Sequence, residues 1–249
     1  MRNSLAAEWL KIRSVRSTYW ILAVVIGSVL LGACLAWLGA RGWDELSPDR
    51  RTRFQAPAME QAILPLAQLC VAVLGVLAIT SEYTTGTITS SLTVRPQRMR
   101  LAAAKIVVVG SVALVAGLVF LFGTFGAARW IVGDRPLSPG YTTSVSEEIP
   151  MLLVTGLVMT ATALIGLGFG VMLRSAAGAI SAVVTLLLFL PMVSRFVPQP
   201  WDVRLSSVML PNLAEHITHG SWAAATALVL YVAGALGGAA ILLKRRDIA

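Results

Sequence analysis

Charged residues are scarce in this sequence of 249 residues. Asp, Glu, Lys and Arg make up 13% of it and hydrophobic residues make up 57%. An ordinary soluble domain has about 25% charged and about 45–50% apolar residues. This balance excludes a soluble enzyme, a disordered chain and a nucleic-acid-binding module. Cysteine is also rare, since the sequence holds two. Two cysteines exclude a disulfide-stapled secreted fold and a zinc site built from cysteines.

Several chemical signatures are missing as well. No glycine is followed by lysine, so the P-loop pattern is absent and we expect the chain not to bind ATP by that route. His216 and His219 are three residues apart, but no third ligand is evident and the order is not that of a zinc protease. We therefore predict no catalytic residues, no metal site and no cofactor bound by this chain.

Long uncharged apolar stretches are what the sequence does contain. About 20 such residues suffice for a helix to cross a membrane. Six stretches qualify: 19–40, 61–80, 106–128, 151–173, 176–193 and 222–243. The first one also resembles the apolar region of a signal peptide, but it is longer than that region usually is. The sequence thus predicts an all-α polytopic membrane protein with six transmembrane helices, in which Arg174 and Ser175 form a tight turn between the fourth and fifth.

Lysine and arginine are distributed unevenly between the two ends of these helices. If the N-terminus is inside, twelve basic residues face the cytoplasm and eight face outward, and the net charges are +9 and −1. Basic residues favour the cytoplasmic side. We therefore expect both termini in the cytoplasm and a multi-pass protein of the cell membrane. The net charge of +8 then reflects topology and contact with an anionic lipid bilayer, and not nucleic acid.

Three segments outside the spans have distinct patterns. Residues 1–18 are predicted to form an interfacial helix anchored by Trp9, Lys11 and Arg13, the alternative being a plain charged tail. Residues 81–105 form the predicted cytoplasmic loop, within which a helix from Pro96 is expected to run into the third span. Residues 194–221 mix three prolines with apolar side chains, which suggests an extracellular re-entrant segment of short helices shielded by protein.

Glycines recur at a spacing of four in two of the spans. Gly166 and Gly170 share one helix face, as do Gly234 and Gly238. Small residues at this spacing let helix backbones approach closely. We expect these glycines to serve packing, either within the chain or between two copies.

Two stretches of the sequence resemble those of a known family. The beginning, LAAEWLKIRSVRSTYW, resembles the elbow-helix entry of permeases of the ABC type-2 transporter family. The stretch Glu82-Tyr83-Thr84-Thr85-Gly86-Thr87, followed by Arg95-Pro96 and Lys105, resembles the family's segment after the second span. The six-span layout agrees with both.

The resemblance implies a type V exporter fold, in which two six-helix permease units form a dimer on cytoplasmic ATP-binding cassette subunits. ATP and Mg would be bound by those partner subunits. The resemblance assigns Glu82, Gly86, Arg95 and Pro96 to the region that couples to the ATPase. Glu82 also has a plainer interpretation, as a helix-end carboxylate paired with a nearby arginine, and the two are compatible.

The resemblance also places the substrate path along the dimer axis, lined by the second and fifth spans, which makes Gln68 and Phe189 path residues. The implied function is the transmembrane subunit of an ATP-driven exporter for an apolar or amphipathic substrate such as a drug, lipid or peptide, because the spans carry no charge. The alternatives are a stand-alone membrane enzyme and a structural membrane protein. The substrate, and whether the dimer partner is a second copy or a paralogue, stay open.

Overall fold

The computed structural model describes residues 9–10, 16–51, 54, 56–84, 98–138, 141 and 144–245. Helices account for nearly all of them, and no strand occurs among them, which confirms the all-α prediction. In chain order the elements are α2 (Arg16–Glu45), α3 (Pro48–Arg51), α4 (Met59–Thr84), α6 (Arg98–Val132), α8 (Val145–Leu173), α9 (Ala176–Val184), the π-helix η1 (Thr185–Phe189), α10 (Leu190–Ser194), α11 (Trp201–Val208), the 3-10 helix η2 (Leu210–Asn212), α12 (Leu213–Thr218) and α13 (Trp222–Arg245).

Six helical stretches are long and apolar enough to cross a membrane, as the sequence predicts. They are Tyr19–Glu45, Met59–Tyr83, Ala102–Val132, Val145–Leu173, Ala176–Ser194 and Trp222–Leu242. Most extend beyond the uncharged stretches of the sequence, so that charged residues lie in their terminal turns. In particular, α4 continues to Thr84 and α6 already begins at Arg98. Both ends of the predicted loop 81–105 are therefore helical.

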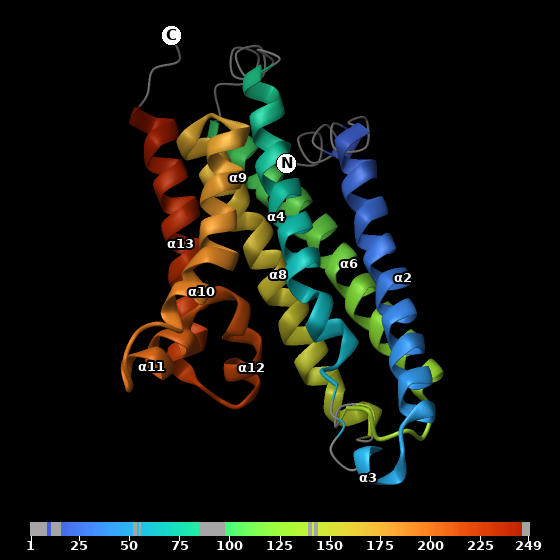
Figure 1. Cartoon of the computed structure of the whole chain (residues 1–249). Helices are drawn as coiled ribbons and strands as arrows, with labels where there is room; N and C mark the ends of the chain where they lie inside the picture. The colour runs from blue at the N-terminus through green and yellow to red at the C-terminus, as the bar shows by residue number, and fades with distance from the viewer. Residues whose placement is uncertain are drawn as a thin grey trace.

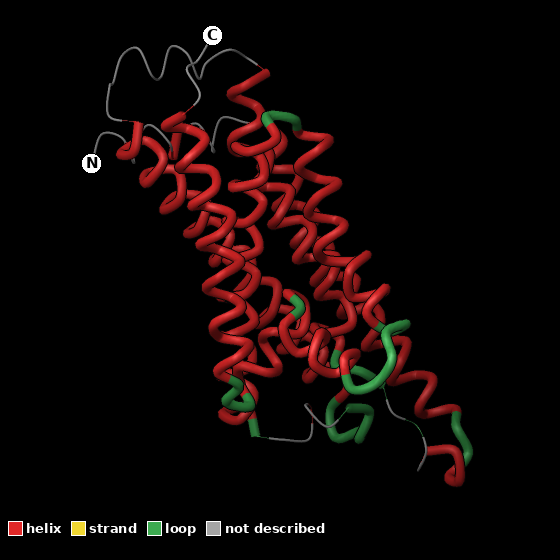
Figure 2. The backbone as a smooth tube through the Cα atoms, turned by 90° about the vertical axis from the view of Figure 1, so that its left-hand side faces the viewer, coloured by secondary structure: helices red, strands yellow, loops and turns green. Residues whose placement is uncertain are grey.

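The helices run side by side along one elongated bundle (Figures 1 and 2). The start of α2, the end of α4, the start of α6, the α8–α9 turn and the end of α13 lie at one end. Helix α3 lies at the opposite end, and α11 and α12 lie in that half of the bundle. The described ends of the first and last spans thus share one side, as an even number of spans requires.

Helix α8 forms the centre of the bundle. It is the most buried of the spans and packs against α4, α6, α12 and α13. Buried apolar side chains of α4 and α6 make up most of one hydrophobic cluster, to which α2 contributes Val25, Ala36 and Ala40. A second cluster joins α8 to α9, α12 and α13. The outer spans, α2, α9–α10 and α13, leave much of their apolar surface exposed, as is expected of helices that face lipid or another membrane protein.

The turn between α8 and α9 is as tight as the sequence predicts. Helix α8 ends at Leu173, and Arg174 adopts the left-handed conformation with φ 51°. Its backbone N–H donates to the carbonyl oxygen of Gly170 at 3.0 Å. Ser175 then caps α9, because its hydroxyl accepts a hydrogen bond from the N–H of Gly178 at 3.3 Å.

The fifth span and the segment after it deviate from regular helix. Residues Thr185–Phe189 form a π-helical turn just before Pro191, which has no N–H to donate. Beyond Ser194 the chain forms α11, η2 and α12, and Leu210 and Leu213 are fully buried. Contacts between α12 and α8 hold the second part of this segment against the bundle, whereas α11 contains no buried residue. Whether the segment enters the membrane stays a prediction.

Candidate functional site

A buried ion pair joins the end of α4 to the beginning of α6. The ammonium nitrogen Nζ of Lys105 lies 2.9 Å from the carboxylate oxygen Oε1 of Glu82, and both side chains are more than 90% buried. Nζ also donates a hydrogen bond to the backbone carbonyl oxygen of Ala78 at 3.1 Å. Lys105 thus binds one side-chain and one backbone oxygen of α4, which fixes its position on that helix.

The surroundings of this pair are largely apolar. Ile79 is buried with Leu167 and Val171 of α8, and Tyr83 and Ile106 pack against them. A charge in such surroundings is costly unless it is paired and hydrogen-bonded. Because Glu82 and Lys105 lie on either side of residues 85–97 in the sequence, their contact holds together the two helix ends that this segment connects.

The same end of α4 also contacts the turn between α8 and α9. The guanidinium carbon Cζ of Arg174 lies 5.6 Å from the ring centroid of Tyr83, the residue that follows Glu82. This distance is within the range of a cation–π interaction. The end of α4 is therefore linked on one side to α6 through charge and on the other to α8 through an aromatic ring.

Glycines bring α4 and α8 into direct backbone contact below this end. A Cβ atom at Gly75 would overlap the carbonyl oxygen of Ala163, and one at Gly166 would overlap that of Ala72. At Gly170 it would lie 2.5 Å from the side chain of Ile79. The pair Gly166 and Gly170 thus packs within the chain. At these positions α4 and α8 pack backbone against backbone, with no room for a larger side chain between them.

The second glycine pair behaves differently. A Cβ atom at Gly238 would meet the sulfur of Met172 at 3.3 Å, but one at Gly234 would meet nothing within 4 Å. The contact between α8 and α13 instead uses Gly168, where a Cβ would lie 2.7 Å from the carbonyl oxygen of Ala235. Close approach of α13 therefore depends on a glycine that the spacing of four does not identify.

A second polar cluster fixes the opposite end of α4. The hydroxyl of Tyr141 donates to the carboxylate oxygen Oε2 of Glu60 at 3.0 Å and accepts a short hydrogen bond from the backbone N–H of Met59. Burial, and after it the charge of Glu60, raises the pKa of Tyr141 above its usual range. The hydroxyl stays protonated at physiological pH and ties the segment before α8 to the first turn of α4.

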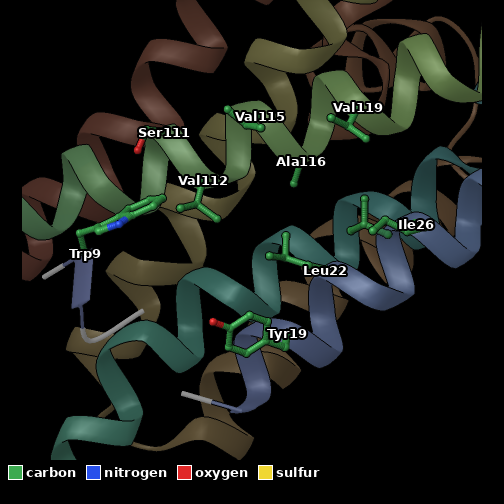
Figure 3. Close-up of a pocket in the computed structure, with 10 residues that line it drawn as sticks. Trp9, Tyr19, Leu22, Ile26, Ser111, Val112, Val115, Ala116 and Val119 are labelled. Atoms are coloured by element: carbon green, nitrogen blue, oxygen red, sulfur yellow. The ribbon is translucent and has the colours of Figure 1, made fainter. Parts of the chain in front are cut away.

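Of the four coupling residues that the sequence predicts, the structure describes Glu82. Glu82 lies in the last turn of α4, and among the described residues it forms an ion pair with Lys105. Gly86, Arg95 and Pro96 lie outside the described residues, as do the predicted anchors Lys11 and Arg13. The third anchor, Trp9, is half-exposed and lies beside α6 (Figure 3).

The two predicted path residues have contrasting environments. Gln68 is 1% exposed within α4, and its amide nitrogen Nε2 has no hydrogen-bond partner among the described residues. Phe189 ends the π-helical turn and is 59% exposed. In the single chain they therefore do not line a common surface, and their role in a path stays a prediction.

Sequence reasoning missed the role of Lys105 and the contact between Tyr83 and Arg174. The signal for Lys105 was present, because an acid ends the second span and a base precedes the third at the same end of the bundle. Tyr83 and Arg174 carry no such signal, since they are 91 positions apart and only the packing of α4 on α8 brings them together.

Comparison with known families adds a further finding. The family model described as ABC-2 family transporter protein matches residues 4–192 of the chain. This range covers well over half of the chain and includes α2 through η1 together with Glu82 and Lys105. No curated protein matches the chain.

Proposed function

The chain belongs to the ABC-2 family of transporter proteins, and from this premise we propose that it is the membrane subunit of an ATP-driven exporter. As a permease of that family it supplies the membrane-crossing part of a transporter, and the six spans agree with this role. We propose that a separate cytoplasmic ATP-binding cassette subunit binds ATP and Mg and supplies the energy. The match over residues 4–192 is the observation that carries the proposal.

The ion pair between Glu82 and Lys105 supports a coupling role for the segment 85–97. A partner that pulls on this segment acts on α4 and α6 together, since the pair ties their ends. The glycine contacts then pass the displacement to α8. Packed helices of this kind move as rigid bodies between discrete arrangements. In this proposal, the ATPase tilts α4, α6 and α8 as a unit between inward-open and outward-open states.

The proposed substrate is apolar or amphipathic. The uncharged central stretches of the six spans support this choice, because a bare ion would find no charged group to replace its hydration shell. We place the path between two permease units, with Phe189 on the exposed face of the fifth span. The same end of the fifth span also exposes Leu190 and Met192, and an apolar surface of this kind suits contact with a second unit or with cargo.

The test is co-purification with an ATPase. The full chain is co-expressed with a candidate ATP-binding cassette subunit and isolated in mild detergent, and ATP hydrolysis is measured after reconstitution. A variant in which a Gly-Ser linker replaces residues 85–97 should insert normally but lose most of the bound ATPase. The matched control replaces residues 195–200, which lie between α10 and α11 in the other half of the bundle, and should retain the ATPase.

Two results would overturn the proposal. One is equal retention of the ATPase by both linker variants, which would remove the coupling role of the segment 85–97. The other is vigorous transport by the purified chain alone in sealed vesicles, because the proposal assigns the energy source to a separate subunit.

A further inference from the structure

An apolar groove lies between α2 and α6. Its volume is about 560 Å³, within the range of about 300–1,000 Å³ that is typical of ligand sites. Figure 3 shows side chains of both helices facing each other across it, with Trp9 and Tyr19 toward one end. The α2 side is formed by Leu22, Val25 and Ile26, and the α6 side by Ser111, Val112, Val115, Ala116 and Val119.

Polarity changes along the groove. The indole of Trp9 and the hydroxyls of Tyr19 and Ser111 are its polar groups, and they lie toward the end where α2 begins. From there to Val119 only aliphatic side chains line it. Ser111 and Val119 are eight positions apart in α6, which corresponds to roughly 12 Å along the helix. The groove therefore fits an elongated molecule with an apolar body and a polar end.

The position of the groove indicates what fills it. Both helices are membrane spans, and Val115 on the groove wall is 61% exposed, so the groove opens toward the bilayer. An apolar cavity of this size does not stabilise water. Trp and Tyr prefer the level of the lipid headgroups, which places the polar end of the groove at the membrane surface and its aliphatic part among the acyl chains.

The sequence around the two aromatic residues adds a charge preference. Lys11, Arg13 and Arg16 lie between Trp9 and Tyr19 in the chain, without any acidic residue among them. Basic residues next to a membrane surface attract anionic headgroups. In the sequence, the two aromatic residues thus flank a basic stretch, which favours an anionic headgroup at this end of the groove.

We propose that the groove between α2 and α6 is a binding site for an anionic phospholipid, with one acyl chain along Val115 and Val119 and the headgroup beside Trp9 and Tyr19. A lipid bound there fills the space between α2 and α6 on the side that faces the bilayer, and its role is structural. The proposal depends on the membrane-spanning character of the two helices and not on the exporter function, so that either can fail without the other.

Photolabelling tests this proposal. The full chain is reconstituted in phosphatidylcholine vesicles that contain a small fraction of phosphatidylglycerol with a photoactivatable group in its acyl chain, and labelled peptides are mapped by mass spectrometry. Groove residues of α2 and α6 should be labelled at least about threefold more than the exposed face of α13. The same group carried on phosphatidylcholine should show no such preference, because the headgroup lacks net negative charge.

A matched pair of variants identifies the site. Val115→Trp fills the groove and should reduce its labelling by at least about half, whereas Val229→Trp makes the same change at an equally exposed position of α13, 65% against 61%, and should leave the labelling unchanged. Val119→Trp repeats the test one turn further along α6.

Three outcomes would overturn the proposal. Equal labelling of the groove and the α13 face shows ordinary lipid contact only. Equal labelling by both headgroups shows that charge plays no part. An absence of groove labels, together with a disulfide between two copies of a Val115→Cys variant, shows that a second chain occupies the groove. Labelling of the groove and of the α13 face is compared in the unmodified protein, so this test does not depend on whether a variant folds.

Discussion

Glu82 and Lys105 show how much a membrane protein depends on pairing its few buried charges. The carboxylate and the ammonium group are 2.9 Å apart, and Lys105 also binds the carbonyl oxygen of Ala78. Removing one member of such a pair leaves an uncompensated buried charge, whereas replacing both by apolar residues is often close to neutral. We therefore expect a single substitution in the pair to destabilise the protein far more than a double apolar substitution does.

We expect Glu82→Ala to lower the free energy of unfolding by about 3–5 kcal/mol, because the charge of Lys105 stays buried without its carboxylate. The double substitution Glu82→Leu with Lys105→Met should recover most of that loss, since neither member of the pair is then left as an unpaired buried charge. Thermal unfolding of the detergent-solubilised protein, followed by circular dichroism, measures both effects.

The exposed pair between Asp44 and Arg135 is the control. Arg135 contacts both carboxylate oxygens of Asp44, at 2.9 and 2.8 Å, but the side chains of Arg135 and Asp44 are 35% and 53% exposed to solvent. Water and salt screen such a pair, so Asp44→Ala should change stability little. Similar losses for Glu82→Ala and Asp44→Ala would show that burial does not strengthen the pair at Lys105.

At the scale of helices, the contact between α4 and α8 is the most extensive in the bundle. It depends on Gly75 and Gly166, at which even one added carbon atom would overlap a backbone carbonyl. Within a membrane, close packing of this kind replaces the hydrophobic effect as the force between helices. A displacement of α4 is therefore expected to move α8 with it.

We predict that Gly75→Ala destabilises the protein by at least about 1–3 kcal/mol, the usual cost of overpacking a well-filled interior. Gly126→Ala is the matched control, because a Cβ at this position on α6 would meet nothing within 4 Å. The unfolding temperatures of the two variants in the same detergent provide the comparison. A Gly75→Ala protein as stable as Gly126→Ala would rule out backbone contact between α4 and α8.

At the scale of the whole molecule, the bundle has two distinct ends. The end with the start of α2 also holds the end of α4 and the end of α13, and the opposite end holds α3 (Figure 1). The distribution of Lys and Arg predicts that the first of these ends faces the cytoplasm. The arrangement of the helices is compatible with either orientation, so an experiment has to decide it.

Cysteine labelling in intact cells measures the orientation. In a background with Cys34→Ala and Cys70→Ala, a cysteine at position 50 in α3 should react with a membrane-impermeant maleimide added from outside. A cysteine at position 98, the first residue of α6, should react only after the cells are permeabilised. The opposite pattern would invert the topology and place the segment 85–97 outside the cell.

Composition and hydropathy determined the class of the fold. Six uncharged stretches of sufficient length are enough to predict six spans, because a backbone in lipid has to satisfy its hydrogen bonds within helices. The tight turn at Arg174 and Ser175 followed from a single charge between two such stretches, and the structure confirms it. The family was likewise visible in two short segments of the sequence, and the match over residues 4–192 confirms it.

Contacts between residues distant in the chain were decided only by the tertiary structure. Hydropathy measures the tendency of a segment to enter lipid and contains no information on which face of a helix meets which neighbour. The partner of Glu82 therefore had to be observed, as did the burial of Gln68, the exposure of Phe189 and the choice of Gly168 over Gly234 for contact with α13. The sequence determined how many helices cross the membrane, and side-chain packing decided how they fit together.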